Sequence, residues 1–196
     1  MTTILLARHG ETDWNRDRRF QGHADPPLNE LGRQQAQGLA ESLADSGVTA
    51  VYASPLARAR ETAEIVAKAL GLPVETRPAL REVDVGSWQG LTRDEVEARY
   101  PDDFRRWLDA GQGWADGESY DELGRRVVAD LLALAARHPG ERILVVTHGG
   151  PVRAAQAAAA ETEYAAARCI SSPVGNCAIL VLDVESERLR RVDSDR

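Results

Sequence analysis

The sequence predicts a single α/β domain in which helices cover both faces of a mostly parallel sheet. Two short apolar runs, residues 4–7 and 143–147, are typical of strands that are buried on both faces. Segments with helical spacing of apolar residues alternate with the candidate strands. A length of 196 residues suffices for one full core and is too short for two ordinary domains. We therefore expect one three-layer α/β/α sandwich spanning residues 1–196.

The first predicted helix follows the N-terminal strand at residues 4–7. Asn29 is suited to cap a helix that runs to about Asp45, because its side chain can accept a free backbone N–H. Leucines and alanines at helical spacing form the expected buried stripe: Leu31, Leu39 and Leu43, with Ala36 and Ala40 beside them.

Residues 48–53 predict a second strand, and another helix follows it. Ser54 and Pro55 are typical of a helix cap and a first helical position, and Gly71 is a plausible end. Apolar residues three and four apart form the predicted buried face of this helix: Leu56, Ala59, Ala63, Val66 and Leu70. A short strand at residues 73–76 is weakly indicated.

Residues 83–117 are expected to form a small helical cap inserted beside the core. Thr92, with Glu95 three residues later, has the spacing of a capping box and predicts a short helix. The segment carries three of the four tryptophans, Trp88, Trp107 and Trp114. Tryptophans of this kind either stack on a sugar, a base or an apolar group of a ligand, or simply pack, and both alternatives stay open.

The last third of the chain predicts a helix, a strand, a helix and a hairpin. Ser119 with Glu122 forms a second capping box, and Pro139 stops the helix that it opens. The strand that ends at Thr147 precedes a helix begun at Pro151. Antiparallel strands at residues 178–184 and 189–192 complete the unit, and the exposed edge of this hairpin leaves a homodimer open.

Charge and composition exclude several classes of function. The formal net charge of −7 argues against a nucleic-acid or membrane-surface binder. No apolar run is long enough to span a membrane, and Arg8 interrupts the N-terminal apolar run too early for a secretory signal, so we expect a cytoplasmic protein. Because Lys68 is the only lysine, an anion site would have to be built from arginines.

Each of the two apolar strands leads directly into a histidine and a glycine. Arg8 and His9 follow one strand, and His148 follows the other. Ligands of open α/β sheets bind outside the carboxyl ends of the strands. Arg58 lies in the first turn of the helix after the second strand, where a guanidinium and free N–H groups together suit phosphate. These residues suggest a phosphate site, although a structural histidine and a surface arginine remain alternatives.

Several motifs, in order along the chain, resemble those of the histidine phosphatase superfamily, also called the phosphoglycerate mutase-like family. The first runs from Leu6 through Arg8, His9, Gly10, Glu11 and Thr12, with Asn15 beyond it. The others lie at residues 20–28, 53–63, 80–90, 117–119 and 147–150. One Arg-His-Gly tripeptide occurs by chance, whereas this many matches in order make the resemblance specific.

The resemblance implies catalysis through phosphohistidine. His9 would be the nucleophile, and Arg8, Arg58 and His148 would hold the phosphate oxygens. Glu82 would be the general acid and then the general base; without the resemblance, this glutamate would be taken as an exposed carboxylate or an ion-pair partner of Arg81. Further matched positions are expected to contact phosphate or substrate: Asn15, Gln21, Gly22 and Gly149.

A metal site is the alternative to this phosphate site. His9, His148 and Glu82 have the ligand types that bind iron or zinc. Two arginines beside the histidines would oppose a cation, so we expect neither a metal nor another cofactor.

The resemblance implies a metal-independent hydrolase of small-molecule phosphomonoesters. A cofactor-dependent phosphoglycerate mutase is the alternative, but such mutases carry a longer insertion between the acid and the second histidine. The short interval here, with its small cap, favours attack by water on the phosphoenzyme. A catalytically inactive phosphate-binding regulatory protein is disfavoured, because every matched position keeps the required chemical type.

Overall fold

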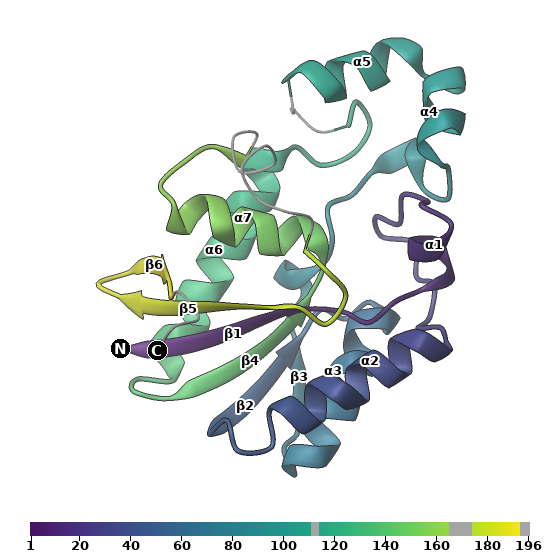
Figure 1. Cartoon of the computed structure of the whole chain (residues 1–196). Helices are drawn as coiled ribbons and strands as arrows, with labels where there is room; N and C mark the ends of the chain where they lie inside the picture. Colours follow the sequence, from purple (N-terminus) through teal and green to yellow (C-terminus); the bar gives the residue numbers. More distant parts are fainter. Residues whose placement is uncertain (111–113, 165–173, 193–196) are drawn as a thin grey trace.

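The computed structural model describes residues 1–110, 114–164 and 174–192, with only the backbone at 109 and 110. They form a six-stranded sheet with the order β3-β2-β4-β1-β5-β6 (Figure 1). Strands β3, β2, β4 and β1 are parallel, whereas β5 and β6 are antiparallel additions at one edge. Their bounds are Thr2–Arg8 (β1), Val48–Ala53 (β2), Val74–Thr76 (β3), Arg142–Thr147 (β4), Ile179–Glu185 (β5) and Arg188–Arg191 (β6).

Helices cover both faces of this sheet, which confirms the predicted fold class (Figure 1). Helices α2 (Glu30–Ser42) and α3 (Ala57–Leu70) lie on one face, and α6 (Tyr120–Arg137) and α7 (Gly149–Ala159) on the other. Successive side chains of β1 alternate between two clusters: Leu5 packs on the α2 and α3 side, and Leu6 on the α6 and α7 side. Within the described part of the chain, no helix is both long enough and apolar enough to cross a membrane.

The remaining helices are short. Helix α1 spans Asp13–Arg16, and the 3-10 helices η1 and η2 span Pro78–Leu80 and Gly86–Trp88. Helices α4 (Arg93–Arg99) and α5 (Pro101–Ala110) lie within residues 83–117, where the sequence predicts a cap-like insertion, and α4 begins at the capping box of Thr92 and Glu95.

Three helix details differ from the sequence prediction. Helix α2 ends at Ser42. Leu31 is 48% exposed, because it lies one residue, or about 100° around the helix, from the buried stripe that contains Ala36 and Leu39. Helix α3 begins at Ala57 rather than at Pro55, because the backbone of Leu56 is extended, with ψ 135°, and a helix cannot include it. Helix α7 begins at Gly149, two residues before Pro151.

The tryptophans of the insertion belong to the core, which corrects the expectation that they lie outside it. Trp88, Trp107 and Trp114 are buried in the same hydrophobic cluster as the β1 and α6 side chains. Their rings contact one another edge to face or tilted, at centroid distances of 5.7–6.4 Å. Packing explains their burial, and Trp107 and Trp114 also reach the wall of a cavity.

Candidate active site

The two histidines lie side by side because their strands are adjacent. Strands β1 and β4 pair in parallel, with Arg8 opposite Thr147, so His9 and His148 are the first residues beyond the paired ends. The His9 N–H donates to Thr147 O at 2.9 Å, and the two imidazole centroids are 5.2 Å apart. The parallel pairing therefore assembles a site from residues that are far apart in the sequence.

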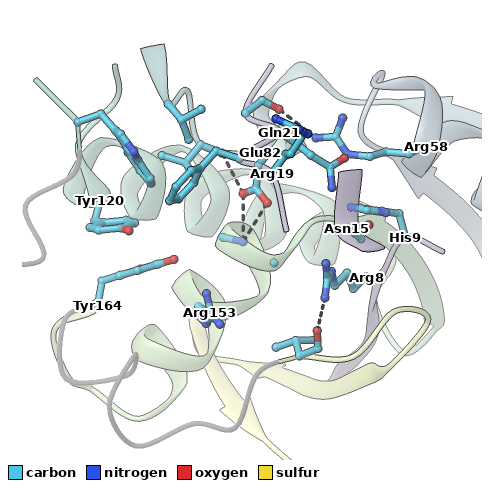
Figure 2. A pocket seen from close by; sticks show the side chains of 18 of the residues that line it. Arg8, His9, Asn15, Arg19, Gln21, Arg58, Glu82, Tyr120, Arg153 and Tyr164 are labelled. Carbon is cyan, nitrogen blue, oxygen red and sulfur yellow. Dashed lines mark hydrogen bonds between the residues drawn. The ribbon is translucent and has the colours of Figure 1, made fainter. Parts of the chain in front are cut away.

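A cavity of about 230 Å³ opens at these strand ends (Figure 2). It is lined by every predicted site residue except His148: Arg8, His9, Asn15, Gln21, Gly22, Arg58, Glu82 and Gly149. Figure 2 shows Arg8, His9 and Arg58 at one end and Tyr120 and Tyr164 at the other. The cavity therefore has a cationic end and an aromatic end.

His9 is held as a neutral imidazole with a defined tautomer. Its Nδ1 lies 2.6 Å from Gly10 O, and because a carbonyl can only accept, Nδ1 carries the proton. Nε2 then keeps its lone pair. Burial lowers the pKa of His9 well below its ordinary value, and the charges of Arg58 and Arg8 lower it further.

Two arginines flank His9, of which Arg8 is partly buried and Arg58 fully buried. Arg8 donates from one terminal nitrogen to Val174 O at 2.6 Å. Arg58 is 0% exposed and donates to Ala24 O at 2.8 Å and Gly22 O at 2.9 Å. Burial lowers the pKa of both guanidinium groups, that of Arg58 to about 10, so both remain charged at neutral pH.

His148 does not line the cavity, and its ring packs edge to face against that of His9. It is 0% exposed, and its Nε2 is 2.7 Å from the hydroxyl of Ser54. Burial lowers its pKa well below the ordinary value, with Arg58, His9 and Arg8 adding to the shift. The predicted contact between His148 and phosphate therefore depends on its other nitrogen, Nδ1.

Three buried nitrogens of this cluster lack hydrogen-bond partners in the described part of the chain. They are Arg8 Nε, Arg58 Nε and His148 Nδ1. An unsatisfied buried polar group costs about 1–3 kcal/mol, so such groups seldom gather without a ligand to satisfy them. Their position beside two full positive charges makes the ligand an anion.

Glu82 also lines the cavity and is close enough to Arg8 and Arg58 for its charge to act on both. Its carboxylate accepts a hydrogen bond from Val83 N–H at 2.9 Å and from Gly150 N–H, in the first turn of α7, at 3.0 Å. A residue with a side chain would not fit at position 150, because its Cβ would overlap Glu82 Oε1. The carboxyl group is thus directed into the cavity by the start of a helix.

The uncharged residues that the sequence predicts at the site, Asn15, Gln21 and Gly22, also line the cavity. Asn15 Oδ1 accepts from Thr12 N–H and from its hydroxyl, both at 3.1 Å, which leaves the Asn15 amide NH₂ available to a ligand. Gln21 lines the same cavity, and its Oε1 is buried with no partner among the residues that the structure describes. Gly22 contributes its carbonyl to Arg58, in a left-handed conformation with φ +51°.

The cavity is also lined by four residues that were not predicted from the sequence: Arg19, Tyr120, Arg153 and Tyr164. Arg153 lies four residues after Gly149 on α7, and this helical spacing could have placed it on the same face. Arg19 comes from a loop with no periodic signal, where it donates to Gly90 O and Glu95. With Arg8 and Arg58, the cavity has four arginines against one glutamate, Glu82.

The histidines and carboxylates do not gather into a metal site in the described residues. No group of three or more histidine, cysteine, aspartate or glutamate side chains there is arranged to hold a metal ion. The arginines beside His9 instead suit a multiply charged anion such as a phosphate group.

The chain is similar to known proteins in both sequence and fold. A sequence model described as the histidine phosphatase superfamily (branch 1) matches residues 4–194. The chain is 44% identical to phosphoglycerate mutase-like protein 4 of Arabidopsis thaliana over 158 residues, which cover 76% of this chain and 67% of that protein. It is 38% identical to phosphoserine phosphatase 1 of Hydrogenobacter thermophilus, over 79% of this chain and 74% of that protein.

A solved structure has the same fold over nearly the whole chain. The mycobacterial glucosyl-3-phosphoglycerate phosphatase superposes with a TM-score of 0.87 at 30% identity. The superposition covers 97% of this chain and 96% of that one.

Proposed function

This chain belongs to the histidine phosphatase superfamily, and from that premise we propose the roles of its site residues. It is a phosphatase that hydrolyses small-molecule phosphomonoesters. His9 is the nucleophile, Arg8, Arg58 and His148 bind the phosphate oxygens, and Glu82 moves the proton. The observation that carries this assignment is the set of three unsatisfied buried nitrogens around a neutral His9.

The first half of the reaction transfers the phosphoryl group to the protein. His9 Nε2 attacks phosphorus in line, so the P–N bond forms while the bond to the ester oxygen breaks. The Nδ1 proton stays on the ring and continues to donate to Gly10 O. Glu82, protonated at the start, gives its proton to the departing alkoxide.

The second half returns the protein to its starting state. Glu82, now ionised, accepts a proton from water as the water oxygen attacks phosphorus. The P–N bond breaks, its electron pair returns to His9 Nε2, and inorganic phosphate leaves. No other reactant is required.

The phosphate cradle is proposed to hold charge through both steps. The Ser54 hydroxyl already accepts Leu56 N–H and can donate to His148 Nε2, which places the ring proton on Nδ1. Nδ1 would then donate to one phosphate oxygen, and Arg8 and Arg58 to the others. A full positive charge on each guanidinium stabilises the transferring group throughout.

We propose that preferred substrates carry a second acidic group near the phosphate. Arg19 is paired with Glu95, and Glu82 starts protonated, so a phosphate dianion balances two of the three remaining arginines and leaves one positive charge over. Arg153 lies on the floor between the phosphate cradle and the tyrosines, where it can bind a carboxylate (Figure 2). Two similar proteins are named for such substrates, phosphoserine and glucosyl-3-phosphoglycerate.

A panel of phosphomonoesters tests this function. Chelator-treated protein is given phosphoserine, 3-phosphoglycerate and phosphoethanolamine, and free phosphate and 2-phosphoglycerate are measured together. We expect phosphate release that His9→Ala abolishes, with phosphoserine preferred over phosphoethanolamine, which lacks the carboxylate. Rapid formation of 2-phosphoglycerate with little phosphate would instead indicate a mutase, and activity retained in His9→Ala would refute the nucleophile.

A further inference from the structure

The segment that carries Glu82 is held in place by side chains. It runs from η1 to η2 without forming a strand or an α-helix. The carbonyl oxygens of residues 79–82 each accept a hydrogen bond from a side chain. Thr147 supplies the donor for Leu80, and a single residue of α6, Arg126, supplies the donors for the other three.

The Arg126 guanidinium forms a clamp on this segment. One terminal nitrogen donates to Ala79 O at 2.6 Å and Arg81 O at 2.8 Å, and the other donates to Glu82 O at 2.9 Å. Glu118 binds the same guanidinium with both carboxylate oxygens, at 2.6 and 2.7 Å. Such a two-pronged pair fixes the plane of the arginine, and its partial burial reduces screening by water.

Two further contacts hold the same stretch of backbone. His23 Nε2 lies 2.9 Å from Glu82 O and therefore donates to it. The N–H of Glu118 donates to Asp84 O at 2.9 Å. Among the described residues that line the catalytic cavity, neither Arg126 nor Glu118 appears, so the pair reaches the acid through the segment that it holds. The charge of Arg126 also helps to lower the pKa of His148, an effect that would act on both kinds of ester alike.

We propose that Arg126, oriented by Glu118, is a positioning residue that holds the carboxyl group of Glu82 at the leaving oxygen. This inference rests on the proposed function, in which Glu82 is the general acid. A catalytic group displaced by about 1 Å loses on the order of a hundredfold in rate. Lysine cannot replace this clamp, because its compact ammonium lacks the planar fork that reaches three carbonyls and a carboxylate together.

The nature of the leaving group separates positioning of an acid from general support of the fold. An alkyl alcohol needs a proton to leave, whereas 2,4-dinitrophenolate is a stable anion and needs little help. We would measure kcat/KM for an alkyl phosphomonoester and for 2,4-dinitrophenyl phosphate with the same preparation of each variant. The ratio of the two values is independent of the fraction of protein that is folded.

The variants are Arg126→Gln, Arg126→Lys and Glu118→Gln, with Glu82→Gln as the benchmark. Arg125→Gln is the matched control, because Arg125 is the neighbouring residue of α6, is exposed, and donates to Asp121 O in its own helix turn. We expect Arg126→Gln to lower kcat/KM for the alkyl ester on the order of a hundredfold, and for the dinitrophenyl ester less than about threefold. Arg126→Lys should show the same selectivity with a smaller loss, and Arg125→Gln none.

Several outcomes would overturn the proposal. Equal losses on both esters, or an unchanged ratio in the Arg126 variants, would show that the clamp does not position the acid. If Glu82→Gln also left the ratio unchanged, the acid role would fail, and the positioning role with it. A selective loss in Glu82→Gln alone would contradict only the role of Arg126, while a wild-type protein inactive on both esters would contradict the proposed function itself.

Discussion

At the scale of single residues, the site depends on imidazoles that stay neutral beside guanidinium groups that stay charged. His9 and His148 share a buried cluster with Arg8 and Arg58, and burial and those charges oppose the protonation of both rings. A protonated His9 would have no lone pair with which to attack phosphorus. The arginines therefore both bind phosphate and keep its nucleophile available.

This arrangement makes the stability of the protein depend on pH. Below the ordinary histidine pKa of 6.5, the unfolded chain takes up protons on His9 and His148, whereas the folded protein does not. The contribution of these two neutral imidazoles to stability is therefore present in full above pH 6.5. It is lost as the pH falls toward their lowered pKa values. Each imidazole contributes a slope of up to about 1.4 kcal/mol per pH unit.

Urea unfolding at several pH values between 7.5 and 5.5 measures this slope. We expect the free energy of unfolding to decrease as the pH is lowered from 7.5 to 5.5. Carboxylates contribute little to the slope in this range, because they stay ionised. His148→Gln, which removes one of the two groups, should have a shallower slope than the wild type. A free energy that is constant, or that rises as the pH falls, would show that these imidazoles are not held neutral.

Many of the site residues could be predicted from the sequence. The end of a strand indicates His9 and the start of a helix indicates Arg58, since parallel strands bring their carboxyl ends to one edge of the sheet. The burial of His148 beside His9 could not be predicted, because it follows from the bond between His148 and Ser54, which lie far apart in the chain. Arg19 and Tyr164 reach the cavity from segments with no periodic pattern, so only the tertiary fold shows them.

At the scale of elements, close packing between the β1 loop and α2 holds the nucleophile in place. Gly10 and Gly32 face each other, and a Cβ on Gly10 would overlap Gly32 O. A Cβ on Gly32 would overlap the backbone of Glu11, two residues after His9. The helix therefore approaches the catalytic loop as closely as backbone atoms allow.

Two glycines of α2 form a matched pair that tests this packing. Gly32→Ala should lower the free energy of unfolding by about 1–3 kcal/mol through overpacking, and should lower kcat because the loop moves. Gly38→Ala, where a Cβ would meet nothing within 4 Å, should stabilise the protein by about 0.5–1 kcal/mol. Thermal unfolding of both variants measures the difference. If Gly32→Ala were as stable and active as Gly38→Ala, the close approach would have no structural role.

The elements were largely predictable because their signals are local. Capping boxes at Thr92 and Ser119 mark helix starts that the structure reproduces. The predicted start of α3 was wrong because Leu56 has an extended backbone, which Ser54 and Pro55 in the sequence do not reveal. The exposure of Leu31 could not be predicted either, because the spacing of the leucines does not show which edge of their stripe packs against the sheet.

At the scale of the whole molecule, an acidic chain concentrates positive charge in one cavity. The formal net charge is −7, yet four arginines and one glutamate line the site. A local positive field of this kind attracts anionic substrates. Aromatic side chains that join the insertion to the core also form the far wall of the cavity, so one cluster serves both packing and the shape of the site.

The most direct test of the central claim is to trap phosphate on the protein. Chelator-treated protein is mixed with a labelled phosphomonoester, quenched in alkali within the time of one turnover, and digested for mass spectrometry. We expect acid-labile phosphate on His9, absent from His9→Ala and hydrolysed at the rate of turnover. Turnover without phosphate on any histidine, or phosphate on a residue other than His9, would contradict the account.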